Sequence, residues 1–420
     1  MTLFEELQAR GLVEAATDPK IADLLNTPQT IYCGFDPSAA SLQAGNLVSI
    51  MMLRRLQLAG HKVIALVGGA TGLIGDPSGK SAERNMLTLD KVEENKRGIR
   101  ENLSRILDFE GPNAAIMVDN YEWYSGLSAI AFLRDVAVNF RVPQMLAKES
   151  VKKRLEASEG ALTFTEFSYQ ILQGNDFLHL FDKYGCTVEV GGADQWGNIT
   201  AGTDLVHRMR GKTAYGLTFP LLLDASGKKF GKSEGNALFM NASMTSVYDW
   251  YQYFLRSADE DVIRYLKVFS LKPLEEIASL EAQMKANPEA RIPQKALAEE
   301  ITLLVHGKDG LKVAQDATST LFGGSVDGKG ADELETIFKD VKSAELSRES
   351  ILGKPVFMVA AQAGMFKSNS EARRMATQGG LALNGAKIDD KRVFSEGDFV
   401  EGRVAVLRSG KKNHFLLKVS

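Results

Sequence analysis

The chain has 420 residues, a formal net charge of −3, and 44% hydrophobic and 25% charged residues. This length and composition predict a large buried core divided among two to four domains of roughly 150 residues each. No apolar run is long enough to span a bilayer, and two cysteines, Cys33 and Cys186, are too few for a disulfide framework or a zinc site. The acids Glu5 and Glu6 are untypical of a secretory signal or transit peptide. We therefore expect a soluble protein of a reducing cytoplasm.

Short apolar runs alternate with helix-period segments in the first half of the chain. Four of these runs stop at glycine or polar residues and are typical of buried strands, at 30–35, 63–69, 114–120 and 186–192. The segment 45–60 between the first two has helical periodicity and ends at Gly60. Strand, helix, strand in repetition predicts a Rossmann-like, doubly wound parallel sheet in an α/β domain. Ligands bind beyond the carboxyl ends of such strands, which points to the loops that follow them.

The sequence pattern is different in the second half of the chain. From about residue 240 the pattern is helical and charge-laced, and residues 323–350 are first Gly-rich and then strongly charged, which suggests a linker. The remainder is predicted as helix, loop, helix and short strands with a turn at Asn384-Gly385. Residues 351–420 hold twelve Lys and Arg against six Asp and Glu, a net of +6, so the first 350 residues carry −9. A basic module fits a polyanionic partner or a solvated basic face, and charge alone does not decide between them.

Two lysine-bearing loops resemble phosphate-binding loops without matching one. GDPSGKS (75–81) and GKKFGKS (227–233) each have three residues between their glycines, whereas a Walker A loop needs four. This spacing argues against a P-loop NTPase. What remains is two loops that can bring positive charge to a phosphate chain.

The stretch SLQAGNL (41–47) places two side-chain amides, Gln43 and Asn46, at the start of a predicted helix. Amides there commonly serve as helix caps. Amide NH2 groups are also hydrogen-bond donors, so the pair could instead hold a ligand at the helix N-terminus.

Taken together, five motifs resemble those of the bacterial-type tyrosyl-tRNA synthetases, a family of class I synthetases. They occur in that family's order and spacing, and with a basic C-terminal module resembling the S4-type RNA-binding fold they cover essentially the whole chain: YCGFDPSAASLQAGNL, ALVGGATGLIGDPSGKSAER, FTEFSYQILQGNDF, GGADQWGNITAG and KKFGKSEGN. The resemblance implies a reaction in which tyrosine and ATP give tyrosyl-adenylate and pyrophosphate, and tyrosine then passes to the terminal ribose of its tRNA. Catalysis of the first step is positioning and charge stabilisation, because the tyrosine carboxylate is itself the nucleophile.

The resemblance also implies roles for individual residues. Family members usually carry His-Ile-Gly-His where this chain has Gln-Ala-Gly-Asn, so Gln43 is expected to donate to the ATP phosphates and Asn46 to the ribose. The residues implied to be catalytic are Gln43, Asn46, Lys80, Arg84, Lys229, Lys232 and Ser233. The residues implied to bind ATP are Cys33, Gly34, Gly45, Ser49, Gly192, Asp194 and Lys232. Mg²⁺ is expected on the ATP phosphates, with no metal held tightly by the protein.

Tyrosine recognition is implied for a third set of residues. By resemblance, Tyr32 and Asp176 hold the substrate hydroxyl, while the groups around its ammonium and carboxylate are Asp36, Asp76, Tyr169, Gln173 and Gln195. Position 175 departs from the family, since Tyr is common there and this chain has Asn175. Phosphate contacts to RNA are expected from Arg373, Arg374, Lys411 and Lys412.

The resemblance further implies a division of the chain. A catalytic domain is expected at 1–225 with a dimer-forming insertion around 120–160, a lysine loop and helical anticodon-recognition domain at 226–325, a linker at 326–350 and the S4-like domain at 351–420. The partners implied are tRNA(Tyr), L-tyrosine, ATP and a second copy of the chain, without a membrane. A buried helix within one subunit explains the insertion's periodicity equally well.

Two alternatives stay open at this stage. A synthetase for another amino acid, such as tryptophan, is disfavoured by Tyr32 with Asp176, which fit a hydroxyl-bearing ligand. A catalytically silent RNA-binding paralogue is favoured by the replacement of both histidines. It is disfavoured by the presence of both lysine loops and the full set of tyrosine ligands, for which a silent protein has no use.

Overall fold

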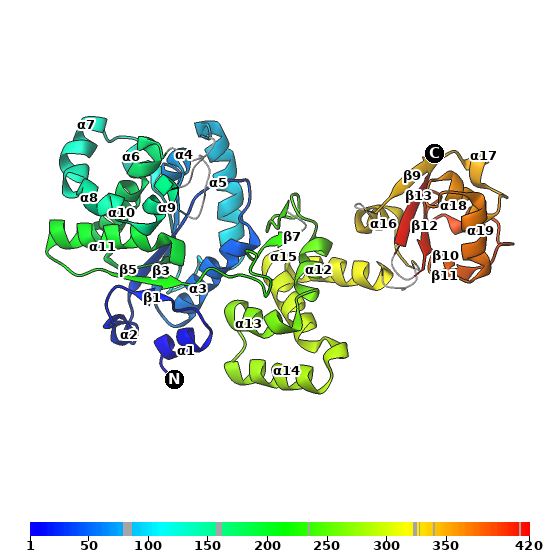
Figure 1. The fold of residues 1–420 in the computed structure, drawn as a ribbon, viewed down its shortest axis with the longest axis horizontal. Helices are drawn as coiled ribbons and strands as arrows, with labels where there is room; N and C mark the ends of the chain where they lie inside the picture. Colours follow the sequence, from blue (N-terminus) through cyan, green and yellow to red (C-terminus); the bar gives the residue numbers. More distant parts are fainter. Residues whose placement is uncertain are drawn as a thin grey trace. The chain divides into compact units, whose positions relative to one another are not determined.

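The structure is a computed structural model that describes residues 1–78, 86–156, 162–233, 236–321, 326, 328–338, 341–410 and 413–420. The chain forms two compact units, Met1–Gly307 and Lys308–Ser420 (Figure 1). Each unit has its own sheet.

A six-stranded sheet organises the first unit, in the order β1-β6-β5-β2-β3-β4. The strands are β1 (Ala15–Ala16), β2 (Thr30–Phe35), β3 (Lys62–Val67), β4 (Ile116–Asp119), β5 (Cys186–Gly192) and β6 (Tyr215–Phe219). Strands β2 to β6 pair in parallel, and only β1 is antiparallel. The chain builds outward from β2 through β3 to β4 and then returns to the other side with β5 and β6. This reversal between β2 and β5 is the switch point at which open α/β sheets bind ligands.

Helices cover both faces of this sheet. The Tyr32 ring packs at 5.2 Å against Phe177 of α10 (Phe164–Tyr184), whereas the next residue, Cys33, faces Ser49 of α3 (Leu47–Leu58). Successive strand residues point to opposite faces, so α10 and α3 lie on opposite sides. The doubly wound parallel sheet is therefore confirmed. The remaining helices around the sheet are α1 (Leu3–Ala9), α2 (Ile21–Leu24), η1 (Ala44–Asn46), α4 (Thr71–Ile74), α5 (Leu89–Ser104), η4 (Ala193–Gln195) and α11 (Trp196–Arg210).

The segment between β4 and α10 is a series of short helices. They are α6 (Tyr121–Tyr124), α7 (Ala129–Ala131), η2 (Phe132–Val136), η3 (Ala137–Asn139), α8 (Val142–Leu146) and α9 (Glu149–Glu156). Several of their apolar side chains are exposed, including Ile130 at 72%. The segment is therefore only partly packed into its own subunit.

A helical region completes the first unit. It begins after the small hairpin of β7 (Lys232–Ser233) and β8 (Asn236–Ala237). Its helices are α12 (Val247–Leu255), α13 (Asp259–Phe269), α14 (Leu274–Ala286), η5 (Pro288–Ala290) and the first part of α15 (Ile292–Leu321). Non-helical backbone at Gly307 interrupts α15, and its residues from Lys308 onward belong to the second unit. Two buried arginines join this region to the sheet. Arg10 donates to the carbonyls of Lys267, Ser270 and Lys272, and Arg55 also donates to that of Ser270. Both cations thus neutralise the negative C-terminal end of α13.

The second unit is built on a five-stranded sheet in the order β11-β10-β12-β13-β9. Its strands are β9 (Ser343–Leu346), β10 (Leu381–Leu383), β11 (Ala386–Ile388), β12 (Val404–Ser409) and β13 (Asn413–Val419), and its helices are α16 (Ala331–Ile337), α17 (Arg348–Ile351), α18 (Val356–Gln362), α19 (Asn369–Thr377) and η6 (Glu396–Asp398). Asn384 and Gly385 both have positive φ and turn β10 into β11. Within the stretch expected to be a linker, α16 forms and β9 pairs in parallel with β13.

Among the helices within the described ranges, we find none with the length and apolar character needed to cross a membrane.

Gly98 gives a direct test of the packing that holds the loop before α3. A Cβ on this α5 residue would lie 1.8 Å from the carbonyl oxygen of Ala40. Alanine normally stabilises a helix relative to glycine, but here the clash must displace the loop. We expect Gly98→Ala to lower the free energy of unfolding by about 1–3 kcal/mol, measured by denaturant titration. The control is Gly126→Ala, since a Cβ there meets no atom within 4 Å. Equal stability of the two variants would contradict the packing.

Candidate active site

A cavity of about 380 Å³ opens at the carboxyl ends of β2 and β5, at the switch point of the sheet. It is lined by every described residue that the sequence nominated for tyrosine or ATP except Ser233, whose side chain is not described. The lining residues from that prediction are Tyr32, Cys33, Gly34, Asp36, Gln43, Gly45, Asn46, Ser49, Asp76, Tyr169, Gln173, Asp176, Gly192, Asp194, Gln195, Lys229 and Lys232. Lys80, Arg84, Lys411 and Lys412 lie outside the described residues. Arg373 and Arg374 are on α19 in the second unit.

The two amides stand where β2 leads into α3. The Asn46 Oδ1 atom accepts a hydrogen bond from the backbone N–H of Gln43 at 3.0 Å, so Asn46 does act as a local cap. This bond uses its oxygen only and does not engage the Nδ2 donors. Capping and ligand binding are therefore compatible in the same side chain. Both amides line the cavity.

The lysine loop is anchored beside these amides. Phe230 is 6% exposed and packs among the rings of Tyr253, Tyr265 and Phe269. The neighbouring backbone N–H of Gly231 donates to the Tyr253 hydroxyl at 2.8 Å. An aromatic anchor from the helical region thus fixes the middle of the loop while Lys229 and Lys232, on either side, face the cavity.

Glycine allows the lysine loop and the amide motif to approach closely. Gly231 has a φ of +85°, and a Cβ on it would lie 3.0 Å from the backbone nitrogen of Gly45. Backbone hydrogen bonds from Ala44 to Leu238 and from Leu238 to Gly231 join the two segments. A side chain at Gly231 would therefore strain the backbone and separate the two segments.

Carboxylates dominate the opposite, deeper end of the cavity. Asp176 on α10 is 2% exposed and accepts hydrogen bonds from Asn120 Nδ2 at 3.0 Å and from Trp123 Nε1 at 2.9 Å. Asp36 accepts from the Tyr169 hydroxyl at 2.8 Å and from the Thr71 hydroxyl at 2.7 Å. These donors come from α4, α6, α10 and the residue that follows β4, so several elements meet around the acids.

A second pair of hydrogen bonds orders the remaining acids. Gln195 Nε2 donates to Asp76 Oδ2 at 2.7 Å, and Gln173 Nε2 donates to Glu189 Oε1 at 2.8 Å. Burial raises the pKa of Asp194, and the nearby charge of Asp76 raises it further. An acidic, donor-lined hollow of this kind suits a ligand with an ammonium group.

Two of the buried carboxyls have strongly shifted pKa values. Burial raises the pKa of Asp176 to about 7, although its hydrogen bonds to Asn120 and Trp123 oppose the shift. Burial also raises the pKa of Glu189 to about 8, against the hydrogen bond from Gln173. A cationic ligand group in the cavity would favour the ionised form of both carboxyls.

Sequence reasoning missed Glu189, Asn120, Trp123 and Thr71. Glu189 was detectable, because it is the one charged residue in the apolar strand run CTVEVGG. Asn120 also carries a signal, since it follows directly after β4 at the ligand-binding edge. Nothing in the chain pattern links Trp123 to Asp176.

Asn175, the departure from the family pattern, does not line the cavity. Its Nδ2 donates to the Tyr124 hydroxyl at 3.1 Å, and that hydroxyl donates to the Leu172 carbonyl at 2.7 Å. Asn175 therefore supports α6, the helix that carries the Asp176 partner Trp123.

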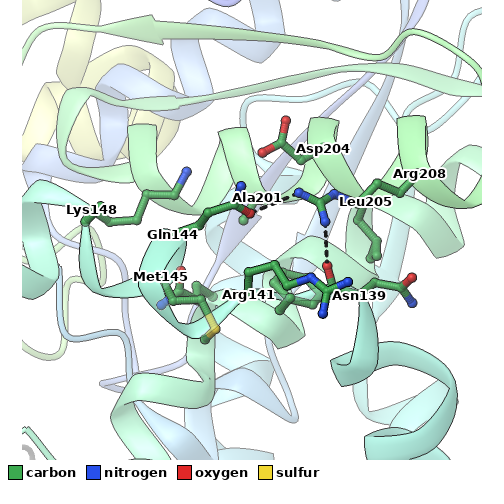
Figure 2. A pocket seen from close by; sticks show the side chains of 12 residues that line it. Asn139, Arg141, Gln144, Met145, Lys148, Ala201, Asp204, Leu205 and Arg208 are labelled. Carbon is green, nitrogen blue, oxygen red and sulfur yellow. Dashed lines mark hydrogen bonds between the residues drawn. The ribbon is translucent and has the colours of Figure 1, made fainter.

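A second, separate cavity of about 310 Å³ lies between α8 and α11 (Figure 2). Arg208 crosses it and donates to the Asn139 carbonyl at 3.2 Å and to Gln144 Oε1 at 2.9 Å. Lys148 donates to the Thr200 hydroxyl at 2.6 Å, and burial lowers its pKa. This hollow is basic and belongs to the partly packed insertion rather than to the sheet edge.

Comparisons with known proteins agree with the site. A family model described as tRNA synthetases class I (W and Y) matches residues 25–323, and one described as the tyrosine–tRNA ligase SYY-like C-terminal domain matches 333–417. The chain is 47% identical to the tyrosine–tRNA ligase of Protochlamydia amoebophila over 99% of both chains. It is 48% identical to that of Bifidobacterium longum, over 98% of this chain and 95% of the relative.

Solved structures show the same relationship. A C-terminally truncated mitochondrial tyrosyl-tRNA synthetase of Aspergillus nidulans aligns with a TM-score of 0.68 and 30% identity, over 76% of this chain and 94% of that one. A tryptophanyl-tRNA synthetase of Encephalitozoon cuniculi, at 13% identity and a TM-score of 0.53, shares the fold alone. The resemblance inferred from the five motifs is thus confirmed, and the chain belongs to the tyrosine–tRNA ligases, class I synthetases that join tyrosine to tRNA in two steps, the first of which consumes ATP.

Proposed function

We propose that the cavity at the switch point activates L-tyrosine with ATP, and that the chain then transfers tyrosine to the 3′-terminal ribose of tRNA(Tyr). The observation that carries the proposal is the polarity of the cavity. Its deep end holds buried carboxylates with ordered donors, and its other wall presents two amides and two lysines. An amino acid fits the deep end with its carboxylates, and a triphosphate fits the wall with the amides and lysines. ATP brings its Mg²⁺ with it as part of the substrate.

The deep end of the cavity provides selectivity for a phenol. Tyr32 and Asp176 are 1% and 2% exposed, and the Tyr32 hydroxyl has no hydrogen-bond partner of normal geometry among the described residues. A substrate hydroxyl would satisfy that group and Asp176 together. Phenylalanine would supply no hydroxyl to either group and would leave the Tyr32 hydroxyl unsatisfied, which is costly for a buried polar group. Tyrosyl-tRNA synthetases are the reference case for this effect, with discrimination of about 10⁵.

The other wall of the cavity acts on charge that develops at the α-phosphate and pyrophosphate. Gln43 is proposed to donate a hydrogen bond to the phosphates and Asn46 to the ribose, while Lys229, Lys232 and Ser233 close on the pyrophosphate. Lys80 and Arg84, which lie outside the described residues, are proposed to reach it from the other side. No nucleophile or base from the protein is needed, because the tyrosine carboxylate attacks the α-phosphorus and pyrophosphate leaves. Cys33, Gly34, Gly45, Ser49, Gly192 and Asp194 are proposed to hold the adenosine and ribose.

RNA binding is proposed for the second unit, as an S4-like module, and anticodon recognition for the helical region after residue 226. Arg373 and Arg374 lie on the exposed side of α19 and would contact phosphates through charge, with strong salt dependence. Arg373 already pairs with Asp390 at 2.9 Å, so RNA must compete with that carboxylate. Lys411 and Lys412 complete the proposed set. Both cysteines are buried free thiols, which suits a reducing cytoplasm.

A homodimer is proposed from the insertion. Its exposed apolar side chains are Leu127, Ile130, Leu133, Val138, Val142, Leu146, Leu155 and, at the start of α10, Phe164. Clusters of this kind are unusual on a monomer and mark interaction surfaces. A second copy of the chain would cover them in a two-fold arrangement.

Tyrosine-dependent exchange of pyrophosphate into ATP tests the adenylation step. We expect exchange with L-tyrosine and essentially none with phenylalanine or tryptophan, because only tyrosine pairs with Tyr32 and Asp176. Exchange with tryptophan alone would show that tyrosine is not the substrate. Folded protein that binds tRNA(Tyr) but exchanges with none of the three would support the silent RNA-binding paralogue.

Lys232→Ala tests the lysine loop. Its charge is expected to contact the transition state more than bound ATP, so kcat for exchange should fall about 10²-fold while the KM for ATP changes much less. Lys228→Ala is the matched control, because Lys228 is exposed on the same loop and does not line the cavity. An unchanged kcat in Lys232→Ala would remove this lysine from the mechanism.

Phe164→Asp tests the homodimer. Phe164 is 74% exposed, so the change should not unfold the subunit, but it would place a charge in an apolar interface. Sedimentation is expected to give twice the chain mass of 45.9 kDa for the natural protein and a single chain for the variant. Leu58→Asp, at a residue 58% exposed on α3, is the control and should stay dimeric. A natural protein that sediments as a monomer would contradict the proposal.

A further inference from the structure

Glu189 is buried in the wall of the active-site cavity without a packing reason for its charge. It is 2% exposed on β5, where a Cβ on Gly202 of α11 would lie 3.4 Å from its Oε2 atom. Among the described residues the Oε2 atom has no hydrogen-bond partner of normal geometry, although the Tyr32 hydroxyl lies close enough to oppose the rise in the pKa of this carboxyl. Burying a carboxylate in this way is costly, and an apolar side chain would fill the space at lower cost. The charge is therefore expected to serve the ligand.

The one well-formed hydrogen bond of Glu189 determines how a neighbouring amide points. Gln173 Nε2 donates to Glu189 Oε1 at 2.8 Å. An ionised carboxylate can only accept hydrogen bonds. It therefore holds the NH2 end of Gln173 toward β5 and leaves the carbonyl end of that amide for the cavity, which Gln173 lines.

We propose that Glu189 is a positioning residue that turns the Gln173 carbonyl oxygen toward the ammonium group of the bound amino acid, and that this holds only while Glu189 is ionised. The inference rests on the proposed function, because it needs an α-amino acid in the cavity. A protonated Glu189 donates its hydrogen to the Gln173 oxygen. The amide then presents its NH2 group to the ammonium group, which repels it.

The neighbours of Glu189 make this switch responsive near neutral pH. The titratable groups that face it are Tyr32 and Cys33 on β2, Asp176 on α10 and Cys186 on its own strand. Burial and the charge of Asp176 raise the pKa of Glu189 to about 8 in the ligand-free protein. Below that pH the carboxyl is largely protonated, so binding of an ammonium group must expel a proton. Affinity for tyrosine is therefore expected to rise as pH increases from 6 to 8.

The test is calorimetric titration of the full chain with L-tyrosine between pH 6 and 8.5, in buffers that differ in ionisation enthalpy so that released protons are counted. Glu189→Gln cannot ionise, and its amide pairs with Gln173 in either orientation. We expect its affinity at pH 8 to be about ten-fold lower than that of the natural protein. We also expect a smaller rise with pH and fewer protons released. Any pH dependence left in the variant belongs to Asp176.

A double-mutant cycle separates positioning from a direct effect of charge. If Glu189 acts through Gln173, then Glu189→Gln should change tyrosine affinity little in a Gln173→Ala background. Thr187→Val on the same strand is the control for general disturbance of β5, because it loses only a bond to Gln29, and should keep the natural pH profile. Melting temperatures verify that each variant is folded.

The outcomes are distinct. Natural protein that does not bind tyrosine contradicts the proposed function. Tyrosine binding with the same affinity, pH profile and proton count in Glu189→Gln contradicts the inference and leaves the function standing. If Glu189→Gln lowers tyrosine affinity equally in the natural protein and in Gln173→Ala, Glu189 acts by its charge alone. This result would also overturn the positioning role.

Discussion

The burial of several carboxylates at one edge of the sheet is the constraint around which the first unit is built. Asp36, Asp76, Asp176 and Glu189 would repel one another in an apolar core unless donors surrounded them. The donors come from several elements: Thr71 from α4, Asn120 after β4, Trp123 from α6, Tyr169 and Gln173 from α10, and Gln195 from η4. The helices and strands must therefore be in place before the acids are stable. The excess negative charge that remains attracts a substrate ammonium group.

The opposite wall of the cavity depends on backbone geometry instead. The lysine loop reaches the amide motif because Gly231 carries no side chain, and it stays there because Phe230 is held by the aromatic cluster of the helical region. Arg10 and Arg55 in turn hold that region on the sheet through the carbonyls at the end of α13. Burial, with the charge of Arg10, lowers the pKa of Arg55 to about 9, yet it remains a cation at neutral pH. The phosphate end of the site is thus positioned by contacts far from it.

How much of the fold and of the site could be predicted from the sequence depends on how far apart in the chain the interacting residues lie. Strand runs such as 63–69 are recognisable as short apolar segments that stop at glycine. The turn at Asn384-Gly385 is recognisable from its two residue types, so both features were predictable. The contacts of Asp176 with Asn120 and Trp123 join residues more than fifty positions apart, and no local pattern encodes them. Residues 343–346 (SAEL) form a strand although Ala and Glu have low strand propensity, because pairing with β13 supplies the backbone hydrogen bonds. Glu189 was recognisable in the sequence as a charged residue within an apolar strand, but its proposed role could be inferred only from its hydrogen bond with Gln173.

The replacement of the family's two imidazoles by amides determines which end of the site contains groups that titrate near neutral pH. An imidazole has an ordinary pKa near 6.5, whereas the amides of Gln43 and Asn46 do not titrate, and no histidine lines the cavity. Donors at the phosphate wall therefore keep the same charge throughout the physiological pH range. The groups of this cavity whose protonation changes near neutrality are then the buried acids at the amino-acid end, Asp176 and Glu189. The response to pH that we propose for this chain therefore belongs to capture of the amino acid, at the end of the cavity where Asp176 and Glu189 lie.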